Sequence, residues 1–173
     1  RISVSFAPHA IYTCPPPFLR EVVAEARRRD VGLHMHVSET AVEVEDCRRQ
    51  WGQSPVEVLA EEGFLDRRLL AAHCVHLSSR DLDLLAQGGC YVAHNPTSNL
   101  KLASGIAPVP EMAAREIPVL LGTDGPASND NLDLLEEIRL TALIHKRSGQ
   151  PGITARQALG MGMDASFFPG KLG

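Results

Sequence analysis

The chain has 173 residues, of which 44% are hydrophobic, and a formal net charge of −4 at pH 7. This length predicts one domain of ordinary size, and the composition suits a folded chain with a buried core. The mildly acidic charge comes without a basic stripe, so nucleic acid is not an expected partner. No apolar run is long enough to cross a membrane. Four scattered cysteines without a C-x-x-C pair favour reduced thiols and a cytoplasmic location.

The first half of the chain predicts strands that alternate with helices. The expected elements are a strand at 2–6, a helix at 16–29, a strand at 31–37, and helices at 43–50 and 55–62. The helix at 16–29 begins at a proline and carries its apolar side chains on one face. Ser54 and Glu57 have the spacing of a capping box, which marks the start of the helix at 55–62.

The second half repeats the alternation. The expected elements are a strand at 69–75, a short helix from Ser78 to Gly88-Gly89, a strand at 90–94, a helix at 109–115, a strand at 117–121, a helix at 132–146 and another from 154. Strands that alternate with helices in this way predict parallel βαβ units.

Polar side chains suited to metal binding or proton transfer follow the expected strands. They are His9, His36 with Glu39, His73 with His76, His94 with Asn95, and Asp124. In a (β/α)8 barrel all the carboxyl ends of the strands face one mouth, where the active site lies. A doubly wound sheet also has its site there, but it usually carries a Gly-rich phosphate loop after the first strand, which this sequence lacks. We therefore predict an α/β fold, a partial (β/α)8 TIM barrel of five strands.

The motif HMHVSET, at 34–40, suits a metal site. His34 and His36 share one face, because strand side chains alternate. Glu39 follows three residues after His36, so His36 could bind a metal with a carboxylate placed over it. The alternative is a strand-end histidine beside a solvated glutamate.

In two later motifs a polar residue likewise follows an apolar strand. In AAHCVHL, at 71–77, His73 ends an apolar run, where the alternative is a core histidine. In LGTDGPASND, at 121–130, Asp124 lies between Gly122 and Gly125, which are expected to let the backbone turn sharply. An acid there is costly unless it is paired or binds a cation, and the alternative is a turn-capping aspartate. Together these donors suit Zn²⁺ or Fe²⁺, with about three protein ligands and one open position.

Taken together, HMHVSET, AAHCVHL, HNPTSNLKLASGIAPV and LGTDGPASNDNLD resemble the amidohydrolase superfamily over roughly residues 4–160. Within it they are most similar to the 5′-methylthioadenosine/S-adenosylhomocysteine deaminases. The resemblance implies a metal-dependent enzyme that deaminates an adenine-type nucleoside and releases ammonia. The implied cofactor is one divalent metal, zinc in the first place and iron as the alternative, and the implied partner is a small purine nucleoside.

The resemblance also implies a role for each matching residue. His36, on the fifth barrel strand, is expected to bind the metal, and Asp124, on the eighth, to bind the metal and act as general base. Glu39 is expected to protonate the ring nitrogen, and His73, on the sixth strand, to orient the metal-bound water. His9, after the fourth strand, is expected to contact the substrate together with Glu39.

Other polar residues of these motifs are given lesser roles. His94, Asn95 and Ser98 are expected to shape the mouth of the site, whereas His34 and His76 are expected to be structural or supporting.

The sequence departs from the family pattern at both ends. The H-x-H pair of the first barrel strand, which completes the metal site in this superfamily, is absent, as are the first three strands. Because the chain opens at Arg1 in a strand, we expect upstream sequence to be missing. Near the other end, a helix of family type runs directly into a PGKL segment. We expect a partial barrel domain at 1–160 and a remnant segment at 161–173.

Two other functions stay open. One is an amidohydrolase that acts on a guanine, pterin or triazine ring. The other is an inactive partial barrel that lacks the H-x-H ligands and whose open edge strands pair with another copy, giving a homo-oligomer, or with a missing segment.

Overall fold

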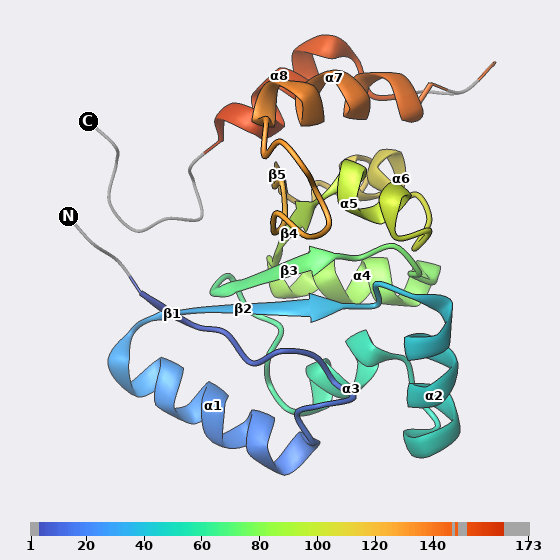
Figure 1. Ribbon diagram of the computed structural model, residues 1–173. Helices are drawn as coiled ribbons and strands as arrows, with labels where there is room; N and C mark the ends of the chain where they lie inside the picture. Colours follow the sequence, from blue (N-terminus) through green and yellow to red (C-terminus); the bar gives the residue numbers. More distant parts are fainter. Residues whose placement is uncertain (1–3, 147, 149–151, 165–173) are drawn as a thin grey trace.

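Five parallel strands form one sheet in the computed structural model, which describes residues 4–146, 148 and 152–164 (Figure 1). They are β1 (Ser5–Phe6), β2 (Gly32–Val37), β3 (Leu69–His73), β4 (Tyr91–His94) and β5 (Val119–Leu121). The sheet order is β1-β2-β3-β4-β5, so each strand pairs with its successor in the chain. A barrel has this sequential order, whereas a doubly wound sheet reverses direction beside its first strand. The order therefore confirms the parallel α/β sheet and favours the barrel arrangement.

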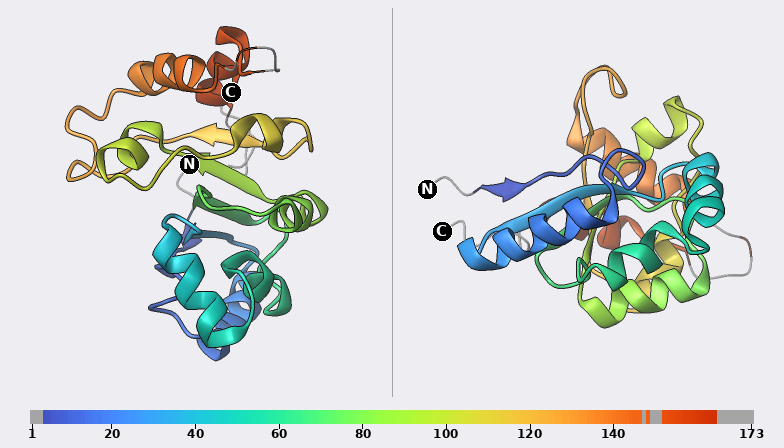
Figure 2. Two further views of the ribbon diagram at one scale, coloured as in Figure 1. Left: turned by 90° about the vertical axis from the view of Figure 1, so that its right-hand side faces the viewer. Right: turned by 90° about the horizontal axis from the view of Figure 1, so that it is seen from below.

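Helices connect the strands and cover one face of the sheet (Figures 1 and 2). They are α1 (Pro16–Arg29), α2 (Ala41–Trp51), α3 (Pro55–Glu61), α4 (Ser79–Gly88), α5 (Pro96–Lys101), α6 (Val109–Ala113), α7 (Leu134–Ile144) and α8 (Ala155–Met163). Helices α7 and α8 pack on each other beside β5, at the end of the sheet opposite to α1. No helix among the described residues is long and apolar enough to cross a membrane.

The strand register separates the sheet into two faces. His36 lies opposite Ala72, Ala72 opposite Ala93, and Ala93 opposite Leu120. On this face the buried apolar cluster is small, since it consists only of Leu70, Ala72, Ala93 and Leu120. The alternate strand residues join the main core beneath the helices. The face that carries His36 is thus left open enough for a site.

The expected elements match the structure closely, with a few corrections. The helix at 16–29 and the capping box of Ser54 with Glu57 are confirmed. The strand expected at 69–75 ends at His73, because His73 and Cys74 both have a positive φ. The short helix α5 was not expected from the sequence, although Pro96 stands at its start.

The chain ends are described only in part. Residues 2 and 3 of the first expected strand and residues 165–173 of the expected C-terminal remnant lie outside the described residues. Helix α8 is continuous through Met163, so the segment expected from residue 161 begins inside a helix.

Candidate active site

His36 is fixed at the end of β2 by the backbone of His9. The carbonyl oxygen of His9 accepts a hydrogen bond from His36 Nδ1 at 2.8 Å and another from the His36 backbone N–H at 3.0 Å. Because a carbonyl oxygen can only accept, Nδ1 carries the proton and Nε2 keeps its lone pair. This tautomer suits a metal ligand. The exposed His9 ring lies 5.0 Å from the His36 ring, between centroids.

His73 is the last residue of β3 and follows Ala72, whose side chain lies on the same face of the sheet as His36. His73 nevertheless lies against His36. Strand alternation alone would direct its side chain toward the helices. The backbone instead turns left-handed at His73, with φ 71°. The ring is buried, and it stacks on the His36 ring with centroids 5.4 Å apart and planes 22° apart. A strained non-glycine φ at this position is typical of functional sites.

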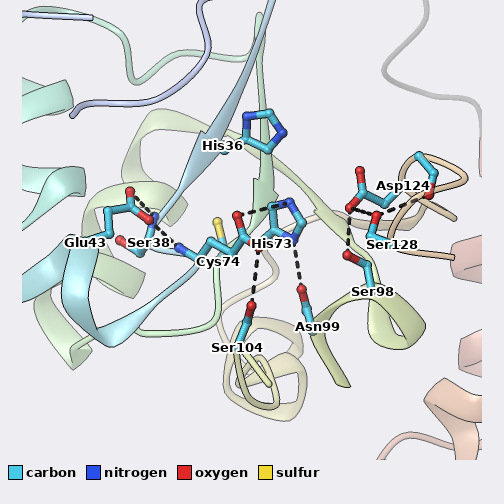
Figure 3. Close-up of polar contacts among 12 residues, drawn as sticks. His36, Ser38, Glu43, His73, Cys74, Ser98, Asn99, Ser104, Asp124 and Ser128 are labelled. Carbon is cyan, nitrogen blue, oxygen red and sulfur yellow. Dashed lines mark hydrogen bonds and ion pairs between the residues drawn. The ribbon is translucent and has the colours of Figure 1, made fainter. Parts of the chain in front are cut away.

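Asn99 lies beside one ring nitrogen of His73 (Figure 3), and Glu39 lies beside the other. Asn99 Oδ1 accepts from His73 Nδ1 at 2.8 Å, which leaves the lone pair on Nε2. The Glu39 carboxylate lies 3.8 Å from that Nε2 and also accepts a hydrogen bond from the Ser104 hydroxyl at 3.3 Å. Glu39 and His73 therefore lie close enough to act on one bound molecule.

Asp124 follows β5 and is held by two hydroxyl groups. Ser98 and Ser128 each donate to the same carboxylate oxygen, Oδ2, at 2.7 Å (Figure 3). Partial burial raises the pKa of Asp124, but the hydrogen bonds from these two serines, the Gly125 backbone N–H and the nearby His73 together outweigh it, so the net pKa lies below its usual value. Asp124 as a whole is exposed, so the cost of burying this acid is smaller than the sequence suggested.

The two glycines beside Asp124 do not provide the sharp turn that the sequence suggested. Asp124 itself adopts the left-handed conformation, with φ 61°. A Cβ atom on Gly122 would lie 2.5 Å from Asn95 Oδ1, whereas one on Gly125 would meet nothing within 4 Å. Close approach explains Gly122, and no packing constraint explains Gly125.

A cavity of about 230 Å³ joins the strand ends on the open face of the sheet. Its polar lining includes His34, His36, Asn95 and Asp124, and the end of α8 closes one side with Met161 and Gly162. His34 was expected to be structural, yet it faces this cavity. Burial lowers the pKa of His34, and the nearby His36 and His73 lower it further.

The polar residues after β4 separate into two groups. Ser98 reaches Asp124 and Asn95 lines the cavity, as expected. His94 does not shape the mouth, because alternation after the inward-facing Ala93 turns its ring away from the cavity. It is fully buried, and its Nε2 lies 3.2 Å from Nε2 of His145. His76 is also structural, since its Nε2 donates to the Ser104 carbonyl at 2.7 Å.

The metal donors form only part of a site. His36 offers a free Nε2 and Asp124 a carboxylate oxygen not occupied by the serines, so both fit the expected donor chemistry. Among the described residues, however, no group of three or more His, Cys, Asp or Glu side chains could hold a metal ion. A catalytic zinc site normally has three protein ligands, so the described strands fit a fraction of such a centre.

Three supporting residues were missed by reasoning from the sequence. Asn99 sets the tautomer of His73, Ser128 holds Asp124, and Glu43 contacts the turn that carries Glu39. Asn99 lies in the HNPTSNLK motif and Ser128 in the TDGPASND motif. The length of these two motifs was a sign that further residues in them belong to the site. Glu43 gave no signal beyond its place in the first turn of a helix.

Comparison with known proteins places this chain in a family. A sequence model of the amidohydrolase family matches residues 1–162. The chain belongs to the amidohydrolase family. The resemblance expected from the motifs is thereby confirmed.

Named relatives of this amidohydrolase chain are bacterial deaminases. It is 52% identical over 154 residues to the 5-methylthioadenosine/S-adenosylhomocysteine deaminase of Desulforudis audaxviator, an alignment that covers 88% of this chain and 36% of the relative. It is 48% identical over 163 residues to the deaminase of the same name from Dictyoglomus turgidum, covering 93% of this chain and 38% of the relative. The chain thus spans little more than a third of these relatives.

Solved structures of two enzymes share the arrangement of the described strands. An adenosine deaminase from Xanthomonas campestris with bound zinc superposes with a TM-score of 0.87 and 37% identity, over 91% of this chain and 36% of that one. The atrazine chlorohydrolase of Arthrobacter aurescens, complexed with zinc, superposes with a TM-score of 0.85 and 29% identity, over 90% of this chain and 35% of that one.

Proposed function

We propose that this chain carries the proton-transfer side of a metal-dependent deaminase that acts on adenine-type nucleosides such as methylthioadenosine, S-adenosylhomocysteine or adenosine. One observation carries the proposal. Glu39 lies 3.8 Å from His73 Nε2, His73 stacks on His36, and His36 lines one cavity with Asp124. The identity of about 50% to named deaminases of this type supports the substrate class.

The five strands would then correspond to barrel strands four to eight. In this assignment His9 follows the fourth strand, His36 ends the fifth, His73 ends the sixth and Asp124 follows the eighth. The sequential strand order supports the assignment, and the solved neighbours align over most of this chain.

Each proton carrier has a place in the proposed hydrolysis. Water adds to the amine-bearing ring carbon while Asp124 accepts its proton, a role favoured by a pKa held low enough for the carboxylate to be ionised at neutral pH. Glu39 gives a proton to the adjacent ring nitrogen, so no ring anion forms. His73 Nε2 orients the water. Asp124 then returns its proton to the amine, which leaves as ammonia as the C–N bond breaks, and the hydroxyl group of the intermediate gives its proton to Glu39 as the ring carbonyl forms.

A divalent metal fits this scheme with His36 and Asp124 among its ligands. When bound, such an ion lowers the pKa of water to roughly 7. The zinc-bound neighbours favour zinc. A complete centre requires further ligands beyond the donors found in the described strands.

Two alternatives remain as proposals. An amidohydrolase acting on a guanine, pterin or triazine ring is one, because the atrazine chlorohydrolase shares this part of the fold. An inactive partial barrel is the other, and the lack of a three-donor group among the described residues favours it.

One experiment separates these functions. The purified chain is analysed for zinc and iron and assayed for ammonia release from methylthioadenosine, S-adenosylhomocysteine, adenosine, guanine, a pterin and a triazine. Ammonia from the adenine nucleosides with stoichiometric metal, abolished in Glu39→Gln, supports the first function. Release from the other rings alone favours the second function, and a metal-free inert chain favours the third.

A further inference from the structure

Glu43 is a buried acid whose position in helix α2 is that of an ordinary capping residue. It is the third residue of the helix, and its own backbone N–H donates to the side chain of the N-cap residue Thr40 at 3.1 Å. Only 6% of Glu43 is exposed. In a capping box the carboxylate of such a residue returns to the backbone N–H of the N-cap. Glu57 makes that contact with Ser54 at the start of α3, at 2.9 Å.

The Glu43 carboxylate instead reaches beyond Thr40 to the turn before the helix. Oε1 accepts the backbone N–H of Ser38 at 3.0 Å, and Oε2 accepts that of Glu39 at 2.7 Å. Figure 3 shows the carboxylate of Glu43 directed at Ser38, next to the end of β3. Capping α2 does not require this reach, because neither N–H belongs to the helix.

The turn held in this way is strained and joins two strand ends. Ser38 is fully buried and has a left-handed φ of 50°, which is costly for a residue with a side chain. Its carbonyl oxygen accepts the backbone N–H groups of Val75 and His76, at 3.1 and 2.9 Å. The turn that carries Glu39 is thereby tied to the loop that follows His73.

A carboxylate is the group that this position requires. Two consecutive N–H donors need two acceptor oxygens, and an amide side chain would place its own NH2 group against one of them. Burial raises the pKa of Glu43 overall, while the hydrogen bonds from the backbone N–H groups of Glu39 and Ser38 act in the opposite direction.

We propose that Glu43 is a positioning residue that fixes the Glu39 carboxylate beside His73 by clamping the backbone of the Ser38-Glu39 turn. The inference rests on the proposed role of Glu39 in proton transfer. Glu43 acts only through Glu39 and does not touch the substrate.

The central test compares Glu43→Gln with the unmodified chain. Amide hydrogen exchange, measured by NMR, is expected to become roughly tenfold faster at Ser38 and Glu39, the factor that loss of one ordinary hydrogen bond gives, while strand amides keep their protection. In the deamination assay we expect kcat to fall on the order of 10- to 100-fold with little change in KM, because a misplaced proton donor loses orientation rather than binding.

Two control variants isolate the clamp. Glu57→Gln removes the matching acid from a normal capping box far from the site, and it should leave exchange at Ser38 and kcat unchanged. Thr40→Ala removes the side-chain cap of α2 itself and keeps both clamp bonds, so it should weaken the helix start without the tenfold effect.

The outcomes decide between a clamp and a cap. Unchanged exchange at Ser38 and Glu39 in Glu43→Gln overturns the proposal, as does an equal effect of Thr40→Ala. Faster exchange with unchanged kcat also overturns it. If the unmodified chain releases no ammonia, the proposed function fails separately, and the exchange data alone then decide whether Glu43 holds the turn.

Discussion

Asn99 Oδ1 lies 2.8 Å from Nδ1 of His73, and this contact determines which nitrogen of the imidazole faces Glu39. The accepting oxygen keeps the proton on Nδ1, so Nε2 presents a lone pair toward the site. Both side chains are 1% exposed, so water cannot replace Asn99 as the partner. A single amide thus sets the chemical character of His73.

Replacing Asn99 with leucine should disturb this tautomer. The Nδ1 proton would lose its partner in a buried place, so we expect destabilisation of about 1–3 kcal/mol and a mixed tautomer state. Chemical denaturation and the ¹⁵N NMR signals of His73 measure the two effects. Asn99→Asp keeps an acceptor at the same place and serves as the control. A leucine variant with an unchanged His73 spectrum would contradict the assignment.

Gly122→Ala should destabilise the chain, because its Cβ would come within 2.5 Å of the buried Asn95 side chain. Overpacking of this kind costs about 1–3 kcal/mol. Gly125→Ala is the matched control, since its Cβ would meet nothing within 4 Å. Urea denaturation of both variants measures the difference. Equal stabilities would show that Asn95 moves aside freely.

The order and type of most elements follow from the sequence for a simple reason. Strands and helices here have strong local signals, such as the proline at the start of α1 and the capping box at Ser54. The strand ends were also predictable as the place where His36, His73 and Asp124 gather, because parallel βαβ units bring those ends to one edge.

The contacts within the site could not be predicted in the same way. The position of His73 depends on a left-handed backbone at its own residue, which strand periodicity does not encode. The role predicted for His94 was wrong, because strand side chains alternate and His94 therefore lies on the opposite face of the sheet from Ala93, which faces the cavity. Asn99 and Glu43 act across 26 and five residues of sequence, respectively, and only the folded backbone brings their partners within reach.

Glu137 should prove more important for stability than its neighbour Glu136. It is buried in α7 and accepts the Thr97 backbone N–H at 3.1 Å and the Asn129 side chain at 2.6 Å. It therefore joins the two segments whose serines hold Asp124. Glu137→Gln places an NH2 group against a donor, so we expect a loss of about 1–3 kcal/mol.

The exposed Glu136 provides the control for this variant. Among the described hydrogen bonds, its carboxylate accepts only from the side chain of Asn131, and Glu136→Gln should change the free energy of unfolding by less than about 0.5 kcal/mol. Thermal and urea unfolding of both variants test the contrast. A Glu137→Gln chain as stable as Glu136→Gln would show that Asp124 is held without this link.

His94 should make the fold sensitive to acid. Burial, followed by the neighbouring His145 and His73, lowers its pKa in the folded chain to about 3, from an ordinary value of 6.5. Between these two values the unfolded chain binds a proton that the folded chain does not. The free energy of unfolding therefore falls as pH decreases through this window, with a slope of at most about 1.4 kcal/mol per pH unit for this one group. Urea denaturation at a series of pH values measures the slope. His94→Asn removes the titrating group, so its unfolding free energy should be lower near neutral pH but should change less between pH 6.5 and 3. A variant with the same slope as the unmodified chain would assign the acid sensitivity to other groups.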